Sequence, residues 1–442
     1  MSQNAHQPYD LKQMQSLPLE YKIIMTKERI KAWYESWTRF EIRNEATGKT
    51  RFVTHDTRDY GEPKLKETEW IVSAYSGSVY VSFSGGKDST VLKHIVDSMY
   101  DDVPALFVNT GLEYPEIQKF AMSQKNVVTV RPKMRFDEVI KKCGYPVISK
   151  EVSNTVRGAK RNIKDGKYSL RLRQLGVRRE EYGGLYDSGK YDYEKTVNKS
   201  KFTQDKWRFL IDADFETSEE CCYYTKKLPV KEYEKETGRK PMIATLACES
   251  MTREAAWRKK GCNAFDAPRP TSQPMSFWTN QDILHYIKKF NVPYCPVYGD
   301  IRVKQEVDND KVFAGQMNMI DYLECYEPED VLETTGCDRT GCIYCMFGCH
   351  LEKEPNRFQR LKQTHPRQYE YCINGGEYGR IRIFDFNGDE IKLKHCTQKQ
   401  IENWVETNRT NARFKIKYDK WRPNKEGLGI GHVLEFIGVE YE

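Results

Sequence analysis

The stretch from Val79 to Leu92 constrains this chain more than any other, because its character changes twice within a few residues. Residues 79–83 (V-Y-V-S-F) are apolar, β-branched or aromatic, which predicts a buried strand. Ser84-Gly85-Gly86 follows as a turn, and apolar side chains then recur at helical spacing at Val91, Leu92, Ile95 and Val96. The sequence therefore predicts a strand, a tight loop and a helix in immediate succession.

A loop of this kind is suited to bind phosphate. Gly85 and Gly86 let the backbone approach an oxyanion closely and adopt positive φ angles that a Cβ disfavours. The following helix directs its unpaired N–H groups and the positive end of its dipole at the same point. Lys87 adds a positive charge, and Ser84 and Ser89 add hydroxyl donors. The spacing of the other common phosphate loop, G-x-x-x-x-G-K-[ST], does not match this stretch.

Alternating strands and helices continue after this loop. Residues 103–108 predict a second strand, which ends in the polar turn Asn109-Thr110-Gly111-Leu112-Glu113. Residues 117–122 then predict a helix, and residues 127–130 predict a third strand. This alternation predicts an α/β fold with a parallel sheet and right-handed crossovers. Ligands of such sheets bind at the carboxyl ends of the strands, so we expect residues 109–113 to lie beside residues 84–89.

Four segments carry a family resemblance. They are S-G-G-K-D-S at 84–89, N-T-G-L-E-Y-P-E at 109–116, E-S-M-T-R at 249–253, and P-M-S-F-W at 274–278 followed by a helical pattern at 280–290. In this order they resemble the PAPS reductase-like branch of the PP-loop ATP pyrophosphatases, a superfamily with the Rossmann-like adenine nucleotide alpha hydrolase-like fold. The resemblance extends from about Ile71 to Cys349.

The resemblance implies an ATP site that works with Mg²⁺. It implies that ATP binds at Ser84, Gly85, Gly86, Lys87, Asp88, Ser89, Asn109, Thr110, Gly111 and Glu113. Lys87, Asp88 and Arg253 are the expected catalytic residues, with Arg253 facing a phosphate of the nucleotide or substrate. Asp88 has two interpretations: it holds the magnesium ion, or it caps the helix that starts beside it.

The length of 442 residues allows two or three domains. We expect an N-terminal helical segment at 1–68, with a helix from about Leu17 to Phe40, and a PP-loop domain at 69–330. A small α+β region is expected at 331–442, with short strands at 381–384 and 391–393 around the turn Asn387-Gly388. No apolar run approaches the roughly 18 residues of a membrane span, and the N-terminus resembles no secretory signal. We therefore expect a cytoplasmic protein that does not bind membranes.

Positive charge is concentrated in one segment. Residues 150–210 contain 16 Lys and Arg against 8 Asp and Glu, an excess larger than the net charge of +7 of the whole chain. The basic residues crowd its first half: Arg157, Lys160, Arg161, Lys164, Lys167, Arg171, Arg173, Arg178 and Arg179. Aromatic residues punctuate it: Tyr168, Tyr182, Tyr186, Tyr191, Tyr193 and Trp207. This pattern suits a nucleic-acid strand, and a solvated insertion loop explains it equally well.

Four of the 13 cysteines, Cys337, Cys342, Cys345 and Cys349, fall within one short stretch. In a chain without a visible secretory signal, this clustering indicates a metal site rather than disulfides. The spacing fits zinc and a 4Fe–4S cluster alike. The resemblance favours the cluster, because cluster-bearing members pair a C-C dipeptide with a later C-x-x-C.

This chain has both elements, Cys221-Cys222 and Cys342-x-x-Cys345. We therefore expect a 4Fe–4S cluster held by Cys342, Cys345 and two of Cys221, Cys222 and Cys337, with zinc as the alternative. Cys222 or Cys349 is then left as a candidate sulfur-handling nucleophile.

The leading hypothesis for function is an enzyme that cleaves ATP to AMP and pyrophosphate and adenylates a substrate oxygen for replacement by sulfur. The resemblance to sulfurtransferases of DNA phosphorothioation and tRNA thiolation points to DNA or tRNA as substrate, and to a sulfur donor such as a cysteine desulfurase. The first alternative is a reductase releasing sulfite from APS or PAPS. Those reductases usually lack the loop lysine and use a C-terminal E-C-G-x-H segment, whereas this sequence has Lys87 and no cysteine after Cys396. The second alternative is a non-catalytic regulator that senses nucleotides or binds DNA.

Overall fold

The computed structural model describes residues 7–59, 63–177, 203–304, 330–379, 381–384, 390–391, 400, 403, 407, 415–418 and 420–442. The chain forms two compact units, each built from separate parts of the sequence. Unit 1 consists of Met1–Asn109, Glu113–Arg131 and Pro229–Gly341. Unit 2 consists of Thr110–Leu112, Pro132–Leu228 and Cys342–Glu442. The sequence analysis instead divided the chain into three consecutive segments.

Unit 1 is organised around one sheet with the strand order β6-β5-β4-β8-β10-β9. Its strands are β4 Val79–Phe83, β5 Ala105–Val108, β6 Val127–Val130, β8 Lys240–Ile243, β9 Asn263–Ala264 and β10 Thr271–Ser272. Neighbouring strands from β6 to β10 are parallel, and β9 pairs antiparallel at one edge. The predicted α/β fold with a parallel sheet is therefore confirmed.

The strand order places β4 at a special position in this sheet. The chain continues from β4 to β5 on one side, and the later strand β8 pairs on the other side. Connections that diverge in this way leave a crevice outside the carboxyl end of the strand, where ligands of α/β sheets bind. The loop at Ser84–Gly86 lies at this point.

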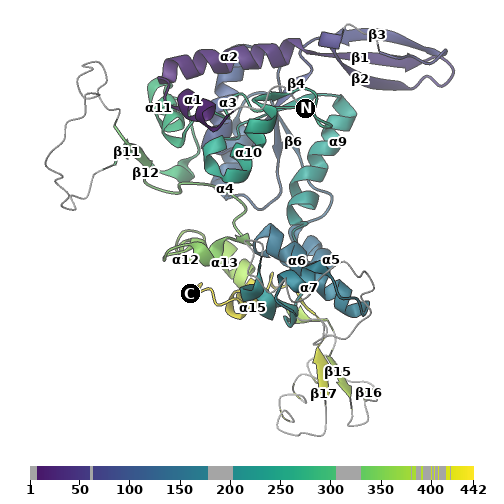
Figure 1. The fold of residues 1–442 in the computed structure, drawn as a ribbon, viewed down its shortest axis with the longest axis vertical. Coiled ribbons are helices and arrows are strands. Elements are labelled where there is room, and N and C mark those ends of the chain that lie inside the picture. Colours follow the sequence, from purple (N-terminus) through teal and green to yellow (C-terminus); the bar gives the residue numbers. More distant parts are fainter. Residues whose placement is uncertain are drawn as a thin grey trace, which may run out of the picture. The chain divides into compact units, whose positions relative to one another are not determined.

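Helices pack around the sheet of unit 1 (Figure 1). They are α1 Pro8–Gln15, α2 Leu19–Glu35, α3 Lys87–Asp97, α4 Pro115–Ser123, α9 Leu228–Thr237, α10 Met251–Lys260 and α11 Asn280–Phe290. The predicted apolar face of α3, which contains Val91, Leu92, Ile95 and Val96, is completely buried. Among the described residues, no helix combines the length and the apolar character needed to cross a membrane.

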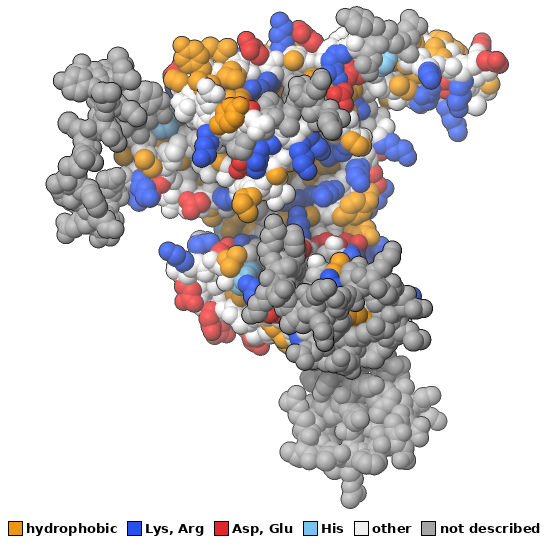
Figure 2. Space-filling view, viewed as in Figure 1, with side chains coloured by type: hydrophobic (Ala, Val, Ile, Leu, Met, Phe, Trp, Pro, Cys, Tyr) orange, Lys and Arg blue, Asp and Glu red, His pale blue; other side chains and the backbone are white. Residues whose placement is uncertain are grey.

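The N-terminal region is only partly helical, which corrects the sequence prediction. The helix α2 ends at Glu35, and Trp37–Asn44 forms β1 instead of extending a helix to Phe40. β1 pairs antiparallel with β2 Thr50–Asp56 and with β3 Glu69–Tyr75, so β3 belongs to this separate sheet rather than to the α/β core. Strand pairing satisfies the backbone of these β-branched and aromatic residues better than a lone helical extension. In Figure 2, basic, acidic and apolar side chains are mixed over this sheet.

A buried ion pair fixes α2 to α11. Lys22 Nζ lies 2.7 Å from Asp282 Oδ1, and the two side chains are 3% and 10% exposed. Asp282 also caps its own helix, because the backbone N–H of Thr279 donates to Asp282 Oδ2 at 2.6 Å. The Asp282 carboxylate therefore both caps the N-terminus of α11 and fixes α2 to α11.

Unit 2 is a smaller mixture of helices and short strands. Its helices are α5 Phe136–Cys143, α6 Lys150–Lys164, α7 Leu170–Gln174, α12 Arg357–Thr364, α13 Pro366–Ile373 and α15 Ile430–Phe436. Its strands are β7 Val147–Ile148, β13 Met346–Phe347, β14 Glu377–Tyr378, β15 Ile381–Phe384, β16 Glu390–Ile391, β17 Lys415–Tyr418 and β18 Trp421–Arg422. β15 and β16 pair antiparallel, as the sequence predicted, although the turn Asn387-Gly388 lies outside the described residues.

The first part of the basic segment is a packed helix. Val152, Val156 and Ala159 of α6 are buried, and Lys160 is buried with them, where its Nζ donates to the carbonyls of Ala213 (2.9 Å) and Phe215 (2.7 Å). Residues 178–202, with Arg178, Arg179, Tyr182, Tyr186, Tyr191 and Tyr193, lie outside the described residues. The described part of the segment therefore contributes to the core of unit 2 and is not a loop alone.

We predict that Lys22→Met strongly destabilises unit 1. The change leaves the buried Asp282 carboxylate without its cation, which costs about 3–5 kcal/mol. Lys31→Met is the matched control on the same helix, because Lys31 is exposed and lies 3.8 Å from Glu35 in a surface pair. The control should change the free energy of unfolding by less than about 0.5 kcal/mol. Urea unfolding of the two variants measures both values, and equal losses would contradict a structural role of the Lys22–Asp282 pair.

Candidate functional site

The loop after β4 has the backbone geometry of an anion-binding turn. Gly85 adopts φ +73°, and a Cβ at this position would lie 3.0 Å from Ile117 Cγ2 and 3.2 Å from the Ile117 carbonyl oxygen. Gly86 is the N-cap of α3 and has extended backbone angles. The loop therefore directs the N-terminus of α3, where the first N–H groups have no partner within the helix, toward the carboxyl end of β4.

Hydrogen bonds of hydroxyl groups stabilise the conformation of this turn. Ser84 Oγ and Ser89 Oγ are 3.0 Å apart, and the backbone N–H of Ser84 donates to Ser89 Oγ at 3.2 Å. The hydroxyls of Ser89 and Thr90 both donate to the Gly86 carbonyl at 2.9 Å. Ser84 and Ser89 therefore hold the shape of the loop in this structure.

Lys87 is buried at the start of α3, and its side chain is only 8% exposed. Its Nζ donates to the backbone carbonyl of Asp338 at 2.9 Å and lies 3.9 Å from Asp88 Oδ1. Its backbone N–H donates to the hydroxyl of Tyr298 at 3.2 Å. Both the side chain and the amide of Lys87 therefore point toward groups at this end of the sheet.

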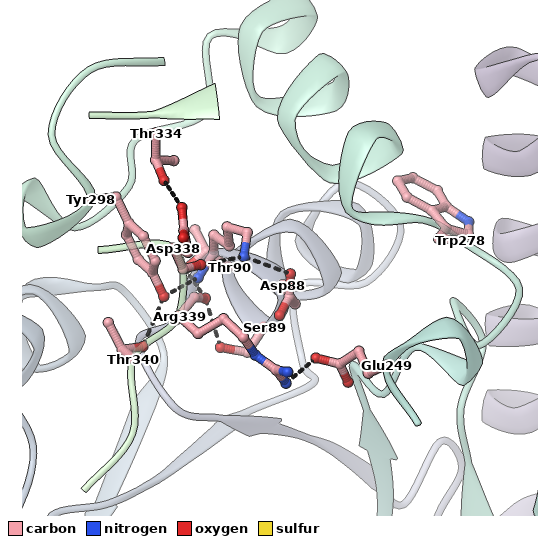
Figure 3. Close-up of polar contacts among 12 residues, drawn as sticks. Asp88, Ser89, Thr90, Glu249, Trp278, Tyr298, Thr334, Asp338, Arg339 and Thr340 are labelled. Carbon is pink, nitrogen blue, oxygen red and sulfur yellow. Dashed lines mark hydrogen bonds and ion pairs between the residues drawn. The ribbon is translucent and has the colours of Figure 1, made fainter. Parts of the chain in front are cut away.

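A strap formed by residues 336–341 lies against the loop (Figure 3). It follows β12 Leu332–Thr334, which pairs with β11 Ile301–Val303. Besides the contact between Asp338 and Lys87, Thr340 Oγ1 is hydrogen-bonded to the hydroxyl of Tyr298 at 2.8 Å. Burial raises the pKa of Tyr298 to about 12, so its hydroxyl stays protonated at neutral pH. The strap thus contacts the Nζ of Lys87 directly, through the Asp338 carbonyl, and the backbone N–H of Lys87 indirectly, through Tyr298.

Two arginines share one buried carboxylate beside the loop. Glu249, whose side chain is 7% exposed, forms ion pairs with Arg253 and with Arg339 of the strap. Burial lowers the pKa of Arg253, and the nearby Arg339 lowers it further. Burial raises the pKa of Asp88, against the opposing charges of Lys87, Arg339 and Arg253. The site therefore combines three cations, Lys87, Arg253 and Arg339, with two carboxylates, Asp88 and Glu249.

Asp88 carries an orphaned atom that bears on its role. Its Oδ1 is buried without a hydrogen-bond partner among the described residues. The described contacts give Asp88 no capping hydrogen bond, since the N-cap of α3 is Gly86 and shows no side-chain bond. An unsatisfied carboxylate oxygen beside a phosphate loop is chemically suited to Mg²⁺.

The second predicted motif begins at the neighbouring strand end. Asn109 directly follows β5, the parallel neighbour of β4, and its N–H donates to the Val130 carbonyl at 2.9 Å. Asn109 and Glu113 belong to unit 1 and are buried, whereas Thr110 and Gly111 belong to unit 2. Within unit 1 the structure therefore brings Asn109 to the same sheet edge as Ser84–Ser89. The P-M-S-F-W motif is different: Trp278 is buried in the core and donates to Thr26 Oγ1 at 2.9 Å.

Cys221 and Cys222 lie in the first turn of a helix in unit 2, directly before the π-helical turn Tyr223–Lys227. Their sulfur atoms are 4.0 Å apart. The hydrogen bond from Cys221 lowers the pKa of Cys222, and Lys150, Lys226 and Lys227 contribute in the same direction. The same bond, together with burial, raises the pKa of Cys221. Such π-turns occur frequently at functional sites.

Cys342 and Cys345 lie in the same unit and close to this pair. Both are within electrostatic reach of Cys221, and Cys345 also interacts with Cys222. The N–H of Cys345 donates to the Cys342 carbonyl at 3.1 Å, which closes a tight turn. The donor chemistry of these four thiols fits a thiolate-bound metal centre. Within the described part of the chain, however, no three Cys, His, Asp or Glu side chains are arranged as a formed metal site.

The remaining cysteines of the stretch differ from these four. Cys337 belongs to unit 1, where its N–H donates to the Val297 carbonyl at 3.1 Å and its sulfur interacts with Cys295. Cys349 is buried, and its thiol donates to the Met346 carbonyl at 3.0 Å. Burial raises the pKa of Cys349 to about 11, which argues against a role as nucleophile.

Sequence reasoning missed Tyr298, Asp338, Thr340 and the pairing role of Glu249. Tyr298 and Asp338 are 211 and 251 residues from Lys87 in the chain, and no local pattern links them to the loop. One signal was present in the sequence, because Arg339 stands three residues before Cys342, the first cysteine of the C-x-x-C element. Its partner Glu249 could not be inferred from that position.

We predict that Gly85→Ala lowers both stability and nucleotide affinity. An alanine at φ +73° costs about 1–3 kcal/mol, and its Cβ would also press on Ile117 and displace the loop. Gly48→Ala is the matched control: Gly48 has φ +65°, and its added Cβ meets no described atom within 4 Å. The control should lose stability but keep its affinity for nucleotide. Chemical unfolding and titration calorimetry measure the two effects, and an unchanged affinity of Gly85→Ala would exclude this loop as the binding site.

The chain is similar to known proteins over parts of its length. Over 84 residues, the chain is 34% identical to an uncharacterized protein of Methanocaldococcus jannaschii, a match that covers 18% of this chain and 20% of that protein. The chain thus spans about a fifth of the length of that curated relative. A crystal structure of phosphoadenylyl-sulfate (PAPS) reductase from Candida auris, in a phosphate complex, aligns with 50% of this chain and 75% of its own. That alignment has 14% identity and a TM-score of 0.25. The phosphoadenosine phosphosulfate reductase domain matches residues 78–182 and 186–347, more than half of the chain, and the protein belongs to this family.

Proposed function

We propose that this protein binds ATP at Ser84–Ser89 and cleaves it to AMP and pyrophosphate, adenylating a substrate oxygen that sulfur then replaces. Family membership points to nucleotide-binding sulfur-transfer or reduction chemistry. The observation that carries the finer proposal is the buried position of Lys87 at the N-terminus of α3, with Arg253 and Arg339 nearby. A triphosphate carries more negative charge than a phosphosulfate, so this concentration of cations favours ATP.

In the proposed reaction, a substrate oxygen attacks the α-phosphorus of ATP. A bond forms between these two atoms, the bond from the α-phosphorus to the bridging oxygen breaks, and pyrophosphate leaves with its electron pair. The N–H groups at the start of α3 and the Nζ of Lys87 stabilise the charge that develops on the phosphates. Sulfide then forms a bond to the activated carbon or phosphorus, and AMP leaves with the former substrate oxygen and its electron pair. The step is a substitution and needs no external oxidant.

Two absent groups fit the residues present. Asp88 would hold Mg²⁺ through its unpartnered oxygen, and the ion would neutralise phosphate charge during the attack. Cys221, Cys222, Cys342 and Cys345 would hold a 4Fe–4S cluster, with zinc as the alternative. When bound, such a cluster would keep the incoming sulfur in a reactive, reduced form.

Nucleic acid, DNA or tRNA, is the proposed substrate. Arg161, Lys164, Lys167 and Arg171 are exposed on or beside α6 and α7, so their charges are available to phosphates. Other basic residues of this segment have internal roles: Arg157 pairs with Glu219 and Glu220, and Lys160 is buried. The surface available to a nucleic acid is therefore smaller than the sequence suggested.

The sulfite-releasing reductase remains the alternative activity, and the family name fits it equally well. The presence of Lys87 in the loop favours ATP over it. A product assay separates the possibilities. Incubation with ATP, Mg²⁺, sulfide and either DNA or tRNA should release AMP and pyrophosphate in equal amounts, with a stimulation by nucleic acid that weakens as salt increases. Sulfite formed from APS or PAPS would instead establish a reductase, and nucleotide binding without either product would indicate a regulator.

We predict that Lys87→Met slows pyrophosphate release by roughly 100-fold or more. Removal of one preorganised cation at a developing charge has effects of this order. Lys289→Met is the control, because Lys289 lies on the surface of α11 and pairs with Glu20 there. A coupled pyrophosphate assay at saturating ATP measures both rates. A Lys87→Met variant as fast as wild type would refute the assignment of Lys87.

We predict that anaerobically purified protein absorbs broadly near roughly 400 nm, as iron–sulfur proteins do. The band should be lost in Cys222→Ser and Cys345→Ser, because a cluster bound by fewer than four thiolates is held weakly. Cys372→Ser is the control, because Cys372 is completely buried in α13 and is not among the proposed ligands. Iron, sulfide and zinc analysis completes the measurement. Stoichiometric zinc with a featureless visible spectrum would replace the cluster with a zinc site.

A further inference from the structure

The arrangement of charges around Arg339 suggests a role that the proposed reaction does not yet use. Arg339 lies in the strap, and its guanidinium pairs with Glu249, the same carboxylate that pairs with Arg253. Burial lowers the pKa of Arg253, and the positive charge of the nearby Arg339 lowers it further. Two guanidiniums placed this close repel each other, and one carboxylate offsets only one of them.

The described charged groups of the site sum to an excess of positive charge, which favours the binding of an anion. Lys87, Arg253 and Arg339 supply three positive charges, and Glu249 supplies one negative charge. The carboxylate of Asp88, 3.9 Å from Lys87 Nζ, supplies a second negative charge. The N-terminus of α3 adds a further positive potential at the same place. A bound anion would balance this excess.

The residues on both sides of Arg339 are tied to Lys87. The Asp338 carbonyl accepts from Lys87 Nζ, and the Thr340 hydroxyl bonds to Tyr298, which accepts from the Lys87 amide (Figure 3). A carbonyl oxygen is a weak substitute for a phosphate oxygen as a partner of an ammonium group. A phosphate that binds Lys87 would therefore take the place of the Asp338 carbonyl, one residue from Arg339.

We propose that Arg339 is a ligand of the nucleotide's phosphate chain, which exchanges Glu249 for a phosphate oxygen when nucleotide binds. This proposal rests on the proposed function, because it needs a nucleotide at Ser84–Ser89. Glu249 then acts as the acceptor that holds Arg339 and Arg253 in place while the site is empty. The planar guanidinium of Arg339 suits two oxygens of a phosphate, which a lysine could not contact in the same way.

Titration calorimetry of the full chain with ATP, AMP and adenosine tests this assignment. Arg339→Ala should weaken ATP binding roughly ten- to a hundredfold, the effect expected for a lost charge-assisted hydrogen bond. The loss should be smaller for AMP and absent for adenosine, which has no phosphate. Arg339→Lys should recover part of the affinity, because it keeps the charge and loses the fork. Arg302→Ala is the matched control, since Arg302 pairs with Glu333 in a similar surface ion pair at 2.9 Å and should bind as wild type.

A further variant separates a ligand from a merely structural arginine. Glu249→Gln removes the competing carboxylate, so ATP affinity should be unchanged or increased if Arg339 binds phosphate directly. If Glu249→Gln weakens ATP as strongly as Arg339→Ala, or if Arg339→Ala weakens adenosine as much as ATP, Arg339 acts through the fold and the inference is overturned. Wild-type affinity of Arg339→Ala for ATP overturns the inference alone. Absence of nucleotide binding by the wild type overturns the proposed function as well.

Discussion

A buried ammonium group needs acceptors, and the site of unit 1 is built to supply them to Lys87. Its Nζ has the Asp338 carbonyl at 2.9 Å, the Asp88 carboxylate at 3.9 Å and the Tyr298 ring centre at 5.7 Å. Each of these partners comes from a different part of the chain, but all converge at the carboxyl end of β4. The parallel sheet makes this possible, because β5 and β8 pair on opposite sides of β4 and the chain connections from these strands run to either side of its carboxyl end.

Local patterns were sufficient to predict the elements that carry the phosphate loop. The apolar run of β4, the two glycines and the helical spacing after Lys87 each specify their own conformation, so strand, loop and helix are as expected. The parallel sheet follows from the same periodicity. The prediction for the N-terminal region was wrong because Trp37–Phe40 continues a plausible helical pattern. Only the pairing of these residues with Thr50–Asp56 selects a strand. Such pairing depends on residues distant in sequence, which a local pattern does not encode.

The candidate site shows the same division. Gly85, Lys87 and Asp88 were identified because they lie in one short motif. Asn109 was identified because it directly follows the neighbouring strand. Tyr298 and Asp338 were missed because their contacts with Lys87 arise from the path of the chain after α11. For the cysteines, spacing indicated Cys342 and Cys345 as a pair, and the structure adds that Cys221 and Cys222 are their neighbours in unit 2. Spacing in sequence could not separate Cys337, which belongs to unit 1, from these four.

The strap gives a physical reason why one chain would place an arginine three residues before a C-x-x-C element. The Asp338 carbonyl is held by Lys87 and the Thr340 side-chain hydroxyl by Tyr298, so both neighbours of Arg339 are fixed before any ligand enters. A ligand group with a fixed backbone loses little entropy on binding, and its charge is then used for selectivity among anions. Glu249 contributes to the same selectivity among anions. Its carboxylate pairs with two guanidiniums in the empty site, so an incoming anion must compete with it. This competition weakens the binding of a singly charged anion more than that of a polyphosphate. The buried carboxylate is therefore part of the discrimination, although it would repel the ligand if it acted alone.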